Sequence, residues 1–273
     1  MPETSLIIRT LNEDKYLKDL LTSIHSQTYK NFEIINVDSG STDETLNIAN
    51  RFNCKSIHIN PEDFTFGYSL NKGIEVASGK FIVIISAHTM PKNEFWLENL
   101  INPLKDTKVA MVFGKQEGGI HSNIGELKDL QRKYTNEKIE LTTKNIFANN
   151  ANSAIQKELW CNYKFNEILT AQEDIDWAKH WLEKDYKVIY EPKSSIYHYH
   201  NEKWDKVRNR YYRESLAYKK IKLWGKRHII KFLLQELLFF NLDIIYAIRS
   251  KKLKDLFLFR INKSFGILKG LFL

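Results

Sequence analysis

Short apolar runs alternate with amphipathic segments over residues 5–113, and this alternation constrains the fold more than any other feature. The runs predict strands at 5–9, 32–37, 55–59, 81–85 and 109–113. Apolar residues at helical spacing between them, such as Leu17, Leu20 and Ile24, predict helices. Because the run Phe81–Ile85 contains no polar residue, it predicts a strand that is buried on both faces. Repeated strand–helix units of this kind predict an α/β fold with a mostly parallel sheet flanked by helices.

Charge is divided unevenly along the chain. Residues 203–273 contain 18 of the 41 Lys and Arg residues but only five of the 33 Asp and Glu residues. A mildly acidic body, residues 1–202, therefore precedes a strongly basic extension, and we predict one domain for each. Such asymmetry indicates an anionic partner, either a membrane surface or nucleic acid. Nucleic acid is not expected, because no nucleic-acid-binding motif accompanies the charge.

Cysteine usage and the absence of long apolar segments indicate the compartment. Cys54 and Cys161 cannot form a disulfide framework, and no Cys-x-x-Cys pair is present. Residues 1–4 lack the basic and apolar regions of a signal peptide. The sequence contains no apolar window of 18 residues, so it predicts no membrane-spanning helix. These features together predict a reducing, cytoplasmic location.

Polar side chains follow three of the predicted strands. In an open α/β sheet the ligand crevice lies at the carboxyl ends of the strands. The residues at these positions are Thr10, Asn12 and Glu13 after the first strand, Asp38, Ser39 and Gly40 after the second, and Ser86, Ala87 and His88 after the fourth. Any one of them alone is as well explained as a helix cap or turn former. Their recurrence at three strand ends predicts a single binding cleft.

A series of motifs in a fixed order resembles the family 2 inverting glycosyltransferases of GT-A fold. The motifs are Thr10-Leu-Asn-Glu13, Val37–Asp43, Ser69–Gly73 with Ala77–Gly79, and Glu173-Asp174. The resemblance covers residues 4–200. Phe64–Gly67, and Ser86–His88 with Pro91, are similar to a bacterial branch that makes surface polysaccharides such as capsule or O-antigen and includes rhamnosyltransferase-like enzymes. The resemblance implies transfer of a hexosyl or deoxyhexosyl group from a dTDP-, UDP- or GDP-linked sugar to a glycan acceptor, which we expect to be lipid-linked.

The same resemblance implies a nucleotide-binding set. It comprises Thr10, Asn12, Glu13, Asp38, Asn71, Lys72, Ser86 and Ala87. Carboxylates at such a site accept hydrogen bonds from base N–H groups and ribose hydroxyls. Two alternatives stay open, because Asp38 would also suit a turn cap and Lys72 would also suit an exposed helix surface.

The expected diphosphate site departs from the family pattern. The family usually places Asp-x-Asp after the fourth strand, where this chain has Ser86, Ala87 and His88. His88 occupies the second Asp position, and His198 matches a late histidine that family members can bring to the metal. The resemblance thus implies that His88 and His198 bind a divalent cation, Mn²⁺ or Mg²⁺. Alternatively, His88 acts on the leaving phosphate without a metal.

The catalytic base implied by the resemblance is Asp174. Inversion in one step requires a carboxylate that deprotonates the acceptor hydroxyl as it attacks. Glu173, Trp177 and Asn152 are implied at the donor and acceptor sugars, although Trp177 suits core packing equally well. Two rivals are a nucleotidyltransferase, whose Gly-rich phosphate loop is absent after the first strand, and a degenerate homologue that binds sugar nucleotides or scaffolds other enzymes without catalysis.

The basic extension is predicted to be helical from residue 202 onward. Its last part carries an apolar stripe consisting of Leu253, Phe257, Ile261, Phe265, Leu268 and Phe272, with basic residues beside it. Such a helix is typical of the membrane interface, and predicts a protein peripheral to an anionic inner membrane face. Residues 229–248 are apolar nearly all round, which favours packing against protein, including a second copy in a homodimer.

Overall fold

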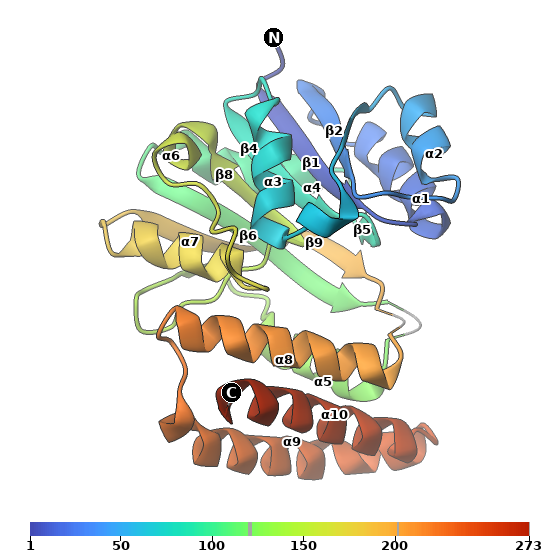
Figure 1. Cartoon of the computed structure of the whole chain (residues 1–273), viewed down its shortest axis with the longest axis vertical. Coiled ribbons are helices and arrows are strands. Elements are labelled where there is room, and N and C mark those ends of the chain that lie inside the picture. Colours follow the sequence, from blue (N-terminus) through green and yellow to red (C-terminus); the bar gives the residue numbers. More distant parts are fainter. Residues whose placement is uncertain (120–121, 201, 273) are drawn as a thin grey trace. The chain divides into compact units, whose positions relative to one another are not determined.

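The computed structural model describes residues 1–119, 122–200 and 202–272, which belong to two compact units (Figure 1). The first unit comprises Met1–Glu117, Tyr134–Ile168 and Glu173–His198. The second comprises Gly118–Lys133, Leu169–Gln172 and Tyr199–Leu273. The second unit therefore includes a segment from the middle of the chain, whereas the charge pattern predicts a single boundary after residue 202.

Parallel strands form one half of the sheet in the first unit. They are β1 (Thr4–Thr10), β2 (Phe32–Asp38), β3 (Lys55–His58) and β4 (Phe81–Ser86), at the predicted positions. β1 lies between β2 and β4, so that Thr10 is opposite Asp38 and Arg9 is opposite Ser86. This register places the carboxyl ends of β1, β2 and β4 next to one another.

Antiparallel pairing forms the other half of the sheet. It contains β5 (Thr89–Pro91), β6 (Val109–Gly118), β7 (Ile139–Glu140), β8 (Asn152–Gln156) and β9 (Lys187–His198). The strand order is β3-β2-β1-β4-β8-β6-β9-β5, and β7 pairs with β9. The α/β class is confirmed, but the expectation of a mostly parallel sheet is wrong for this half. The prediction missed β8, because the run Asn-Ser-Ala-Ile-Gln is short and polar at both ends.

Helices pack on both faces of the first unit's sheet (Figure 1). Their bounds are α1 (Asp14–His25), α2 (Thr45–Arg51), α3 (Phe66–Glu75), α4 (Trp96–Ile101), α6 (Lys157–Asn162) and α7 (Glu173–Leu182). α1, α2 and α4 bury their apolar stripes against Leu6, Val83 and alternate neighbours in the strands. α3 packs on the other face, where a Cβ at Gly73 would stand 2.7 Å from Ile7 Cγ2. Glycine at this position therefore allows α3 to approach the sheet closely.

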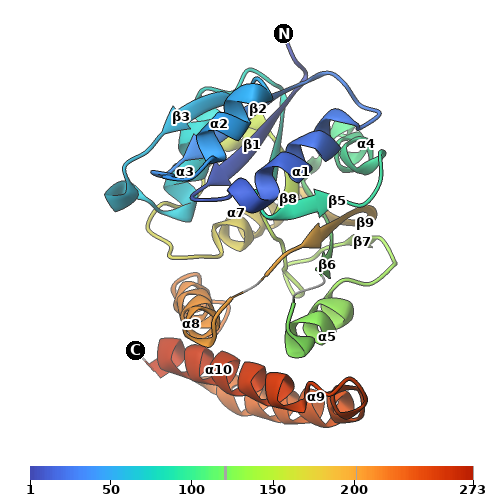
Figure 2. The same cartoon turned by 90° about the vertical axis from the view of Figure 1, so that its right-hand side faces the viewer.

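Four α-helices are described in the second unit: α5 (Ile124–Lys133), α8 (Trp204–Lys220), α9 (Ile229–Arg249) and α10 (Leu253–Phe272), as Figure 2 shows. The helical prediction after residue 202 is thus confirmed. α10 packs on α8 through Gly266 and Gly270, where a Cβ would collide with Arg208 O of α8 and with Ser215 Oγ. The close approach of α8 and α10 therefore depends on these two glycines.

A charged cluster joins α5, α9 and α10. It consists of Asp129 and Arg132 from α5, Glu236 and Asp243 from α9, and Arg260 and Lys263 from α10. The guanidinium of Arg260 lies 3.1 Å from a Glu236 carboxylate oxygen and 3.0 Å from an Asp243 oxygen. Lys263 Nζ lies 2.6 Å from Glu236. Because these acids are buried with basic partners, their burial carries no uncompensated charge.

Within the chain, α9 packs against protein on one side only, and the expectation that residues 229–248 pack against protein, including a second copy, stays a prediction for the other side. Among its described side chains the buried ones are Phe232, Glu236, Asp243 and Ala247. On the opposite side the large apolar side chains are exposed, from 42% for Leu233 to 73% for Ile230. The stripe on α10 is partly exposed, with Phe257 and Phe265 on the surface. None of the described helices is long and apolar enough to cross a bilayer.

Candidate functional site

The carboxyl ends of β1 and β2 are linked by hydrogen bonds. Thr10 Oγ1 lies 3.1 Å from Asp38 Oδ1, and Asp38 Oδ2 accepts hydrogen bonds from the backbone N–H groups of Gly40 and Ser41, each at 3.0 Å. Asp38 is fully buried. Its side chain therefore caps the turn after β2, and its contact with a nucleoside stays a prediction.

Asn12 links the loops that follow β1 and β2. Its Oδ1 accepts a hydrogen bond from Thr42 N at 2.8 Å, and its own N–H donates to Ser41 Oγ at 2.9 Å. The residue adopts a left-handed conformation with φ 55°, which Asn tolerates better than most residues. These contacts hold an exposed polar rim at the strand ends where the sequence predicts the nucleotide.

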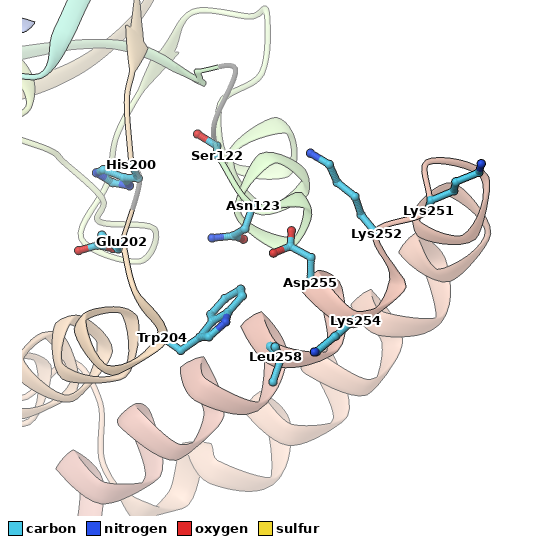
Figure 3. A pocket seen from close by; sticks show the side chains of 10 residues that line it. All are labelled: Ser122, Asn123, His200, Glu202, Trp204, Lys251, Lys252, Lys254, Asp255 and Leu258. Atoms are coloured by element: carbon cyan, nitrogen blue, oxygen red, sulfur yellow. The ribbon is translucent and has the colours of Figure 1, made fainter.

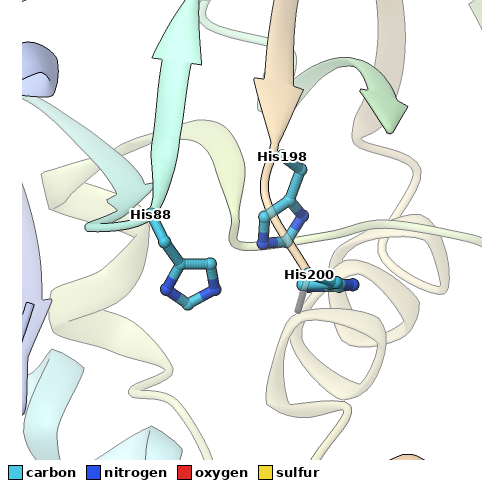
Figure 4. Close-up of side chains that lie close together, drawn as sticks. All are labelled: His88, His198 and His200. Carbon is cyan, nitrogen blue, oxygen red and sulfur yellow. The ribbon is translucent and has the colours of Figure 1, made fainter. Parts of the chain in front are cut away.

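His88 and His198 lie face to face beside this rim (Figure 4). Their ring centroids are 5.1 Å apart. His88 Nδ1 lies 2.9 Å from Glu13 Oε1, and Ser86 Oγ lies 3.2 Å from His88 Nε2. His198 Nδ1 lies 2.9 Å from Gln116 Oε1. The structure thus brings the two predicted metal ligands together, and Glu13, which the resemblance assigns to the nucleotide, contacts His88.

This arrangement fits a divalent cation. Histidines that bind metals usually donate their second ring N–H to an oxygen acceptor, which fixes the tautomer and the ring orientation. Glu13 and Gln116 are such acceptors for His88 and His198. When each Nδ1 carries the proton, each Nε2 carries the lone pair that a metal requires. Imidazole nitrogens bind first-row divalent ions, whereas Mn²⁺ and Mg²⁺ prefer oxygen ligands, and the side chain of Ala87 contributes none.

His200, also drawn in Figure 4, belongs to the second unit. There its Nδ1 lies 2.7 Å from Glu126 Oε1, which also accepts a hydrogen bond from Arg210 at 2.7 Å. Burial alone would raise the pKa of Glu126, but the positive charges of Arg210 and His200 lower it to about 2. Glu126 is therefore a carboxylate across the neutral pH range.

The two acidic residues at the start of α7 form a nearly buried pair. Glu173 is 4% exposed and Asp174 is 8% exposed. Asn150 contacts both, because its backbone N–H donates to Asp174 Oδ2 at 2.9 Å and its Nδ2 donates to Glu173 Oε1 at 3.3 Å. Ile175 N also donates to Asp174 Oδ1 at 2.7 Å. These hydrogen bonds fix the orientation of both carboxylates.

Arg9 connects this acidic pair electrostatically to the strand ends. Its guanidinium lies 4.8 Å from the ring centroid of Phe66 and donates a hydrogen bond to Phe66 O at 3.3 Å. Burial lowers the pKa of Arg9, and the negative charges of Glu173 and Asp174 act in the opposite direction. Since Arg9 precedes Thr10 on β1, the predicted base lies within electrostatic range of the carboxyl end of this strand.

Asn152 and Trp177 both lie in the interior of the first unit. Asn152 is fully buried, where its Oδ1 accepts a hydrogen bond from Trp96 Nε1 at 2.9 Å and its Nδ2 donates to Ser194 O at 2.8 Å. Trp177 is also fully buried and donates from Nε1 to Tyr163 O at 2.7 Å. Trp177 therefore offers no exposed face to a sugar, which favours the core-packing alternative. Sugar contact by Asn152 gains no support from its placement.

Asn71 and Lys72 lie on α3 but differ in their surroundings. Asn71 is buried, and its Oδ1 accepts hydrogen bonds from Trp160 Nε1 at 2.9 Å and Phe165 N at 3.1 Å. Lys72 lies at the surface, where its Nζ is 3.3 Å from Glu75. The environment of Lys72 favours the exposed-surface alternative, and that of Asn71 indicates a role in joining α3 to the loop near Phe165.

Sequence reasoning missed three residues of the site. Asn150 belongs to the polar run 149–153, from which Asn152 was the predicted contact. Arg9 could have been recognised as a charged residue at the end of an apolar strand. Gln116 carries no sequence signal of its own, because only the pairing of β6 and β9 in the fold brings it to His198.

Known proteins are similar to this chain in sequence and in fold. The family model described as glycosyl transferase family 2 matches residues 5–161. The chain is 28% identical over 212 residues to the O-antigen chain rhamnosyltransferase WbaN of Salmonella anatum, covering 74% of this chain and 67% of the relative.

It is 34% identical over 129 residues to a dolichyl N-acetyl-alpha-D-glucosaminyl phosphate 3-beta-D-2,3-diacetamido-2,3-dideoxy-beta-D-glucuronosyltransferase of Methanococcus voltae, covering 45% and 40% of the two chains.

A solved structure shares the fold. The mannosyltransferase PcManGT from Pyrobaculum calidifontis, in complex with GDP-Man and Mn²⁺, superposes with a TM-score of 0.66 and 20% identity over 82% of this chain and 65% of that chain. The matches thus span between 40% and 67% of the length of these three proteins. Because the family model covers more than half of the chain and the sheet has a GT-A-like fold, the chain belongs to glycosyl transferase family 2.

Proposed function

We propose that the chain is an inverting enzyme that transfers a hexosyl or deoxyhexosyl group from a dTDP-, UDP- or GDP-linked sugar to a lipid-linked surface glycan at the cytoplasmic face of the cell membrane. The names of the relatives support this proposal, because one is a rhamnosyltransferase of O-antigen chains and another acts on a dolichyl-linked sugar. The solved neighbour contains a nucleoside diphosphate sugar.

The observation that carries the proposal is the fixed carboxylate of Asp174. Asn150 and Ile175 orient it through backbone N–H donors, and Arg9 couples it to the strand ends. In a one-step inversion, this carboxylate accepts the acceptor hydroxyl proton while the hydroxyl oxygen bonds to the anomeric carbon. The bond between that carbon and the diphosphate breaks, and the nucleoside diphosphate leaves with the bonding electrons.

His88 and His198 are the residues that would hold a divalent cation. Such an ion, when bound, neutralises charge on the leaving diphosphate. Glu13 and Gln116 orient the two imidazoles for this role. The polar rim around Asn12 would then contact the nucleoside. Full transfer activity in excess EDTA would contradict the metal assignment.

The experiment compares Asp174→Asn with a matched control, Glu183→Gln, which changes an exposed carboxylate just after α7. Transfer is measured with dTDP-, UDP- and GDP-sugars, and donor binding by thermal stabilisation. We expect Asp174→Asn to lose about 10²–10⁴-fold in turnover, because general-base catalysis contributes that much. Donor binding should persist, and Glu183→Gln should behave as the unmodified chain.

Two outcomes would overturn the proposal. Near-normal turnover of Asp174→Asn would show that this carboxylate is not the base. Donor binding by the unmodified chain, without turnover of any donor on lipid-linked acceptors, would instead favour the non-catalytic alternative.

A further inference from the structure

α9 presents its apolar residues to solvent and its acidic residues to the interior of the second unit. The exposed side chains include Ile230, Leu234, Leu237, Leu238, Leu242 and Ile245, each more than half exposed. Spacings of three, four and seven residues place them on one side of the helix. A helix on the surface of a water-soluble unit normally has the reverse arrangement, so this apolar face requires a cover.

The charged cluster stabilises this inverted orientation. Glu236 and Asp243 are the two acidic residues of α9, and both point inward to Arg260. Seven residues separate them, so they lie on the same side, opposite the exposed leucines. Because both acids face inward, the outer face of α9 carries no negative charge between Lys231 and Arg249. The cluster thus determines which side of α9 faces outward.

Basic residues flank the apolar face at both of its ends. Lys226 and Arg227 lie just before α9, and Lys231 lies in its first turn. Arg249 ends α9, Lys251 and Lys252 lie in the turn that follows, and Lys254 lies in the first turn of α10. All seven are exposed. The partner that covers the face must therefore tolerate or attract positive charge at both ends.

A pocket of about 540 Å³ lies at the second basic end, within the helical unit (Figure 3). Lys251, Lys252 and Lys254 line it together with Trp204. Its two acids have other partners, since Glu202 accepts a hydrogen bond from Arg210 at 2.8 Å and Asp255 accepts one from Ile124 N at 2.9 Å. Within residues 202–272 no ion pair of the three lysines is found. Three lysines against two carboxylates leave this end of the unit with a net positive charge.

We propose that α9 lies flat on an anionic lipid bilayer, with its apolar face among the acyl chains and its two basic ends on lipid phosphates. Charge decides between a bilayer and a second copy of the chain. Because both ends of α9 are basic, two copies packed face to face would bring like charges together in either the parallel or the antiparallel orientation. An anionic surface complements both ends at once.

The test uses the full chain and sedimentation with vesicles of phosphatidylcholine alone or with 30% phosphatidylglycerol. The first variant is Leu234→Glu/Leu238→Glu, and its matched control is Ile168→Glu, which changes an exposed apolar residue of the first unit. The second variant is Lys251→Gln/Lys252→Gln/Lys254→Gln. Circular dichroism verifies that each variant keeps its helices, since all altered side chains are exposed.

We expect binding to the anionic vesicles that weakens as salt increases. The triple lysine variant should lose about a hundredfold in partition coefficient, since each basic residue near the surface contributes about 1 kcal/mol. The double leucine variant should lose at least as much, and Ile168→Glu should bind normally. Equal partition of the unmodified chain into both vesicle types, or unchanged binding by the leucine variant, would overturn the proposal.

A concentration-dependent dimer that the leucine variant dissolves, without any vesicle binding, would identify a second copy as the partner and would also overturn it. The measurement needs neither donor nor turnover. Failure of the proposed glycosyl transfer would therefore leave this result unaffected, and the reverse also holds.

Discussion

Both units bury carboxylates, but they compensate the buried charge in different ways. In the first unit Glu173 and Asp174 are held by N–H donors of Asn150 and Ile175. In the second unit Glu236 and Asp243 form ion pairs with Arg260. The buried guanidinium of Arg9 responds to the charges of Glu173 and Asp174, whereas Arg260 is in direct contact with Glu236 and Asp243 and so joins α10 to α9.

The burial of acidic residues alone therefore does not identify a catalytic site. The helical pattern alone does not separate the two pairs, and only Glu173-Asp174 belongs to the motif series. Their partners in the structure differ as well. Four substitutions of charged residues in the two units test these roles, in decreasing order of the effect that we expect.

The largest effect is expected from Arg260→Met. The variant leaves Glu236 and Asp243 buried without their shared guanidinium, and breaking a buried pair in this way costs about 3–5 kcal/mol of unfolding free energy. Hydrogen exchange of α9 and α10 would measure the loss. Lys231→Met, at an exposed position of α9, is the control and should be neutral. Equal stability of both variants would show that the cluster does not hold the helices.

A second prediction concerns acid. Because the pKa of Glu126 is lowered from 4.5 to about 2, it stabilises the fold fully above the unfolded-state pKa. That stability, about 3 kcal/mol, should disappear as pH falls from 4.5 toward 2. Unfolding of Glu126→Gln should consequently depend less on pH in this window. Glu62→Gln, at an exposed site of the first unit, should follow the unmodified chain, and an equally steep loss in Glu126→Gln would contradict the assignment.

An intermediate effect is expected from Glu13→Ala. This carboxylate orients His88, and loss of such a partner typically weakens metal binding by about 10–100-fold. Electron paramagnetic resonance of Mn²⁺ titrated into the chain would measure the change without any turnover. Glu44→Ala, in the neighbouring loop, should leave Mn²⁺ affinity as it is. Unchanged affinity in Glu13→Ala would argue against His88 as a ligand.

The smallest effect is expected from Lys72→Ala. Its ion pair with Glu75 is exposed, and exposed pairs contribute little to stability. Donor affinity and thermal stability should both stay within experimental error of the unmodified chain. A clear loss of donor affinity would restore Lys72 to the nucleotide site.

The sequence predicted those elements whose apolar pattern is local. The runs 5–9 and 81–85 form β1 and β4, because a short apolar, β-branched segment between two helical segments is most compatible with a buried strand. β8 depends on neighbours far away in the chain, and its own residues are too polar to reveal it. The two histidines were found from motif order, but Gln116 was not, because a strand pairing brings it to His198.

The apolar pattern of the sequence also could not predict which side of α9 faces outward. Apolar residues surround most of this helix, which predicts burial by composition alone. The signal that specifies its outer face is the spacing of Glu236 and Asp243, and its meaning depends on Arg260 in a different helix. Apolar periodicity identifies the buried face of a helix whose other face is in water. For a helix that lies on a lipid bilayer, as we propose for α9, the apolar face is instead the outer one.

Assembly of the second unit from separated segments has a consequence for synthesis. Asp129 in α5 meets its partner Arg260 only 131 residues later in the chain. At a translation rate of about 5–20 residues per second, α5 leaves the ribosome roughly 7–26 seconds before that partner exists. The nascent chain must therefore carry α5 without its final contacts while the sheet forms, and any shortening that removes α10 would make this temporary state permanent.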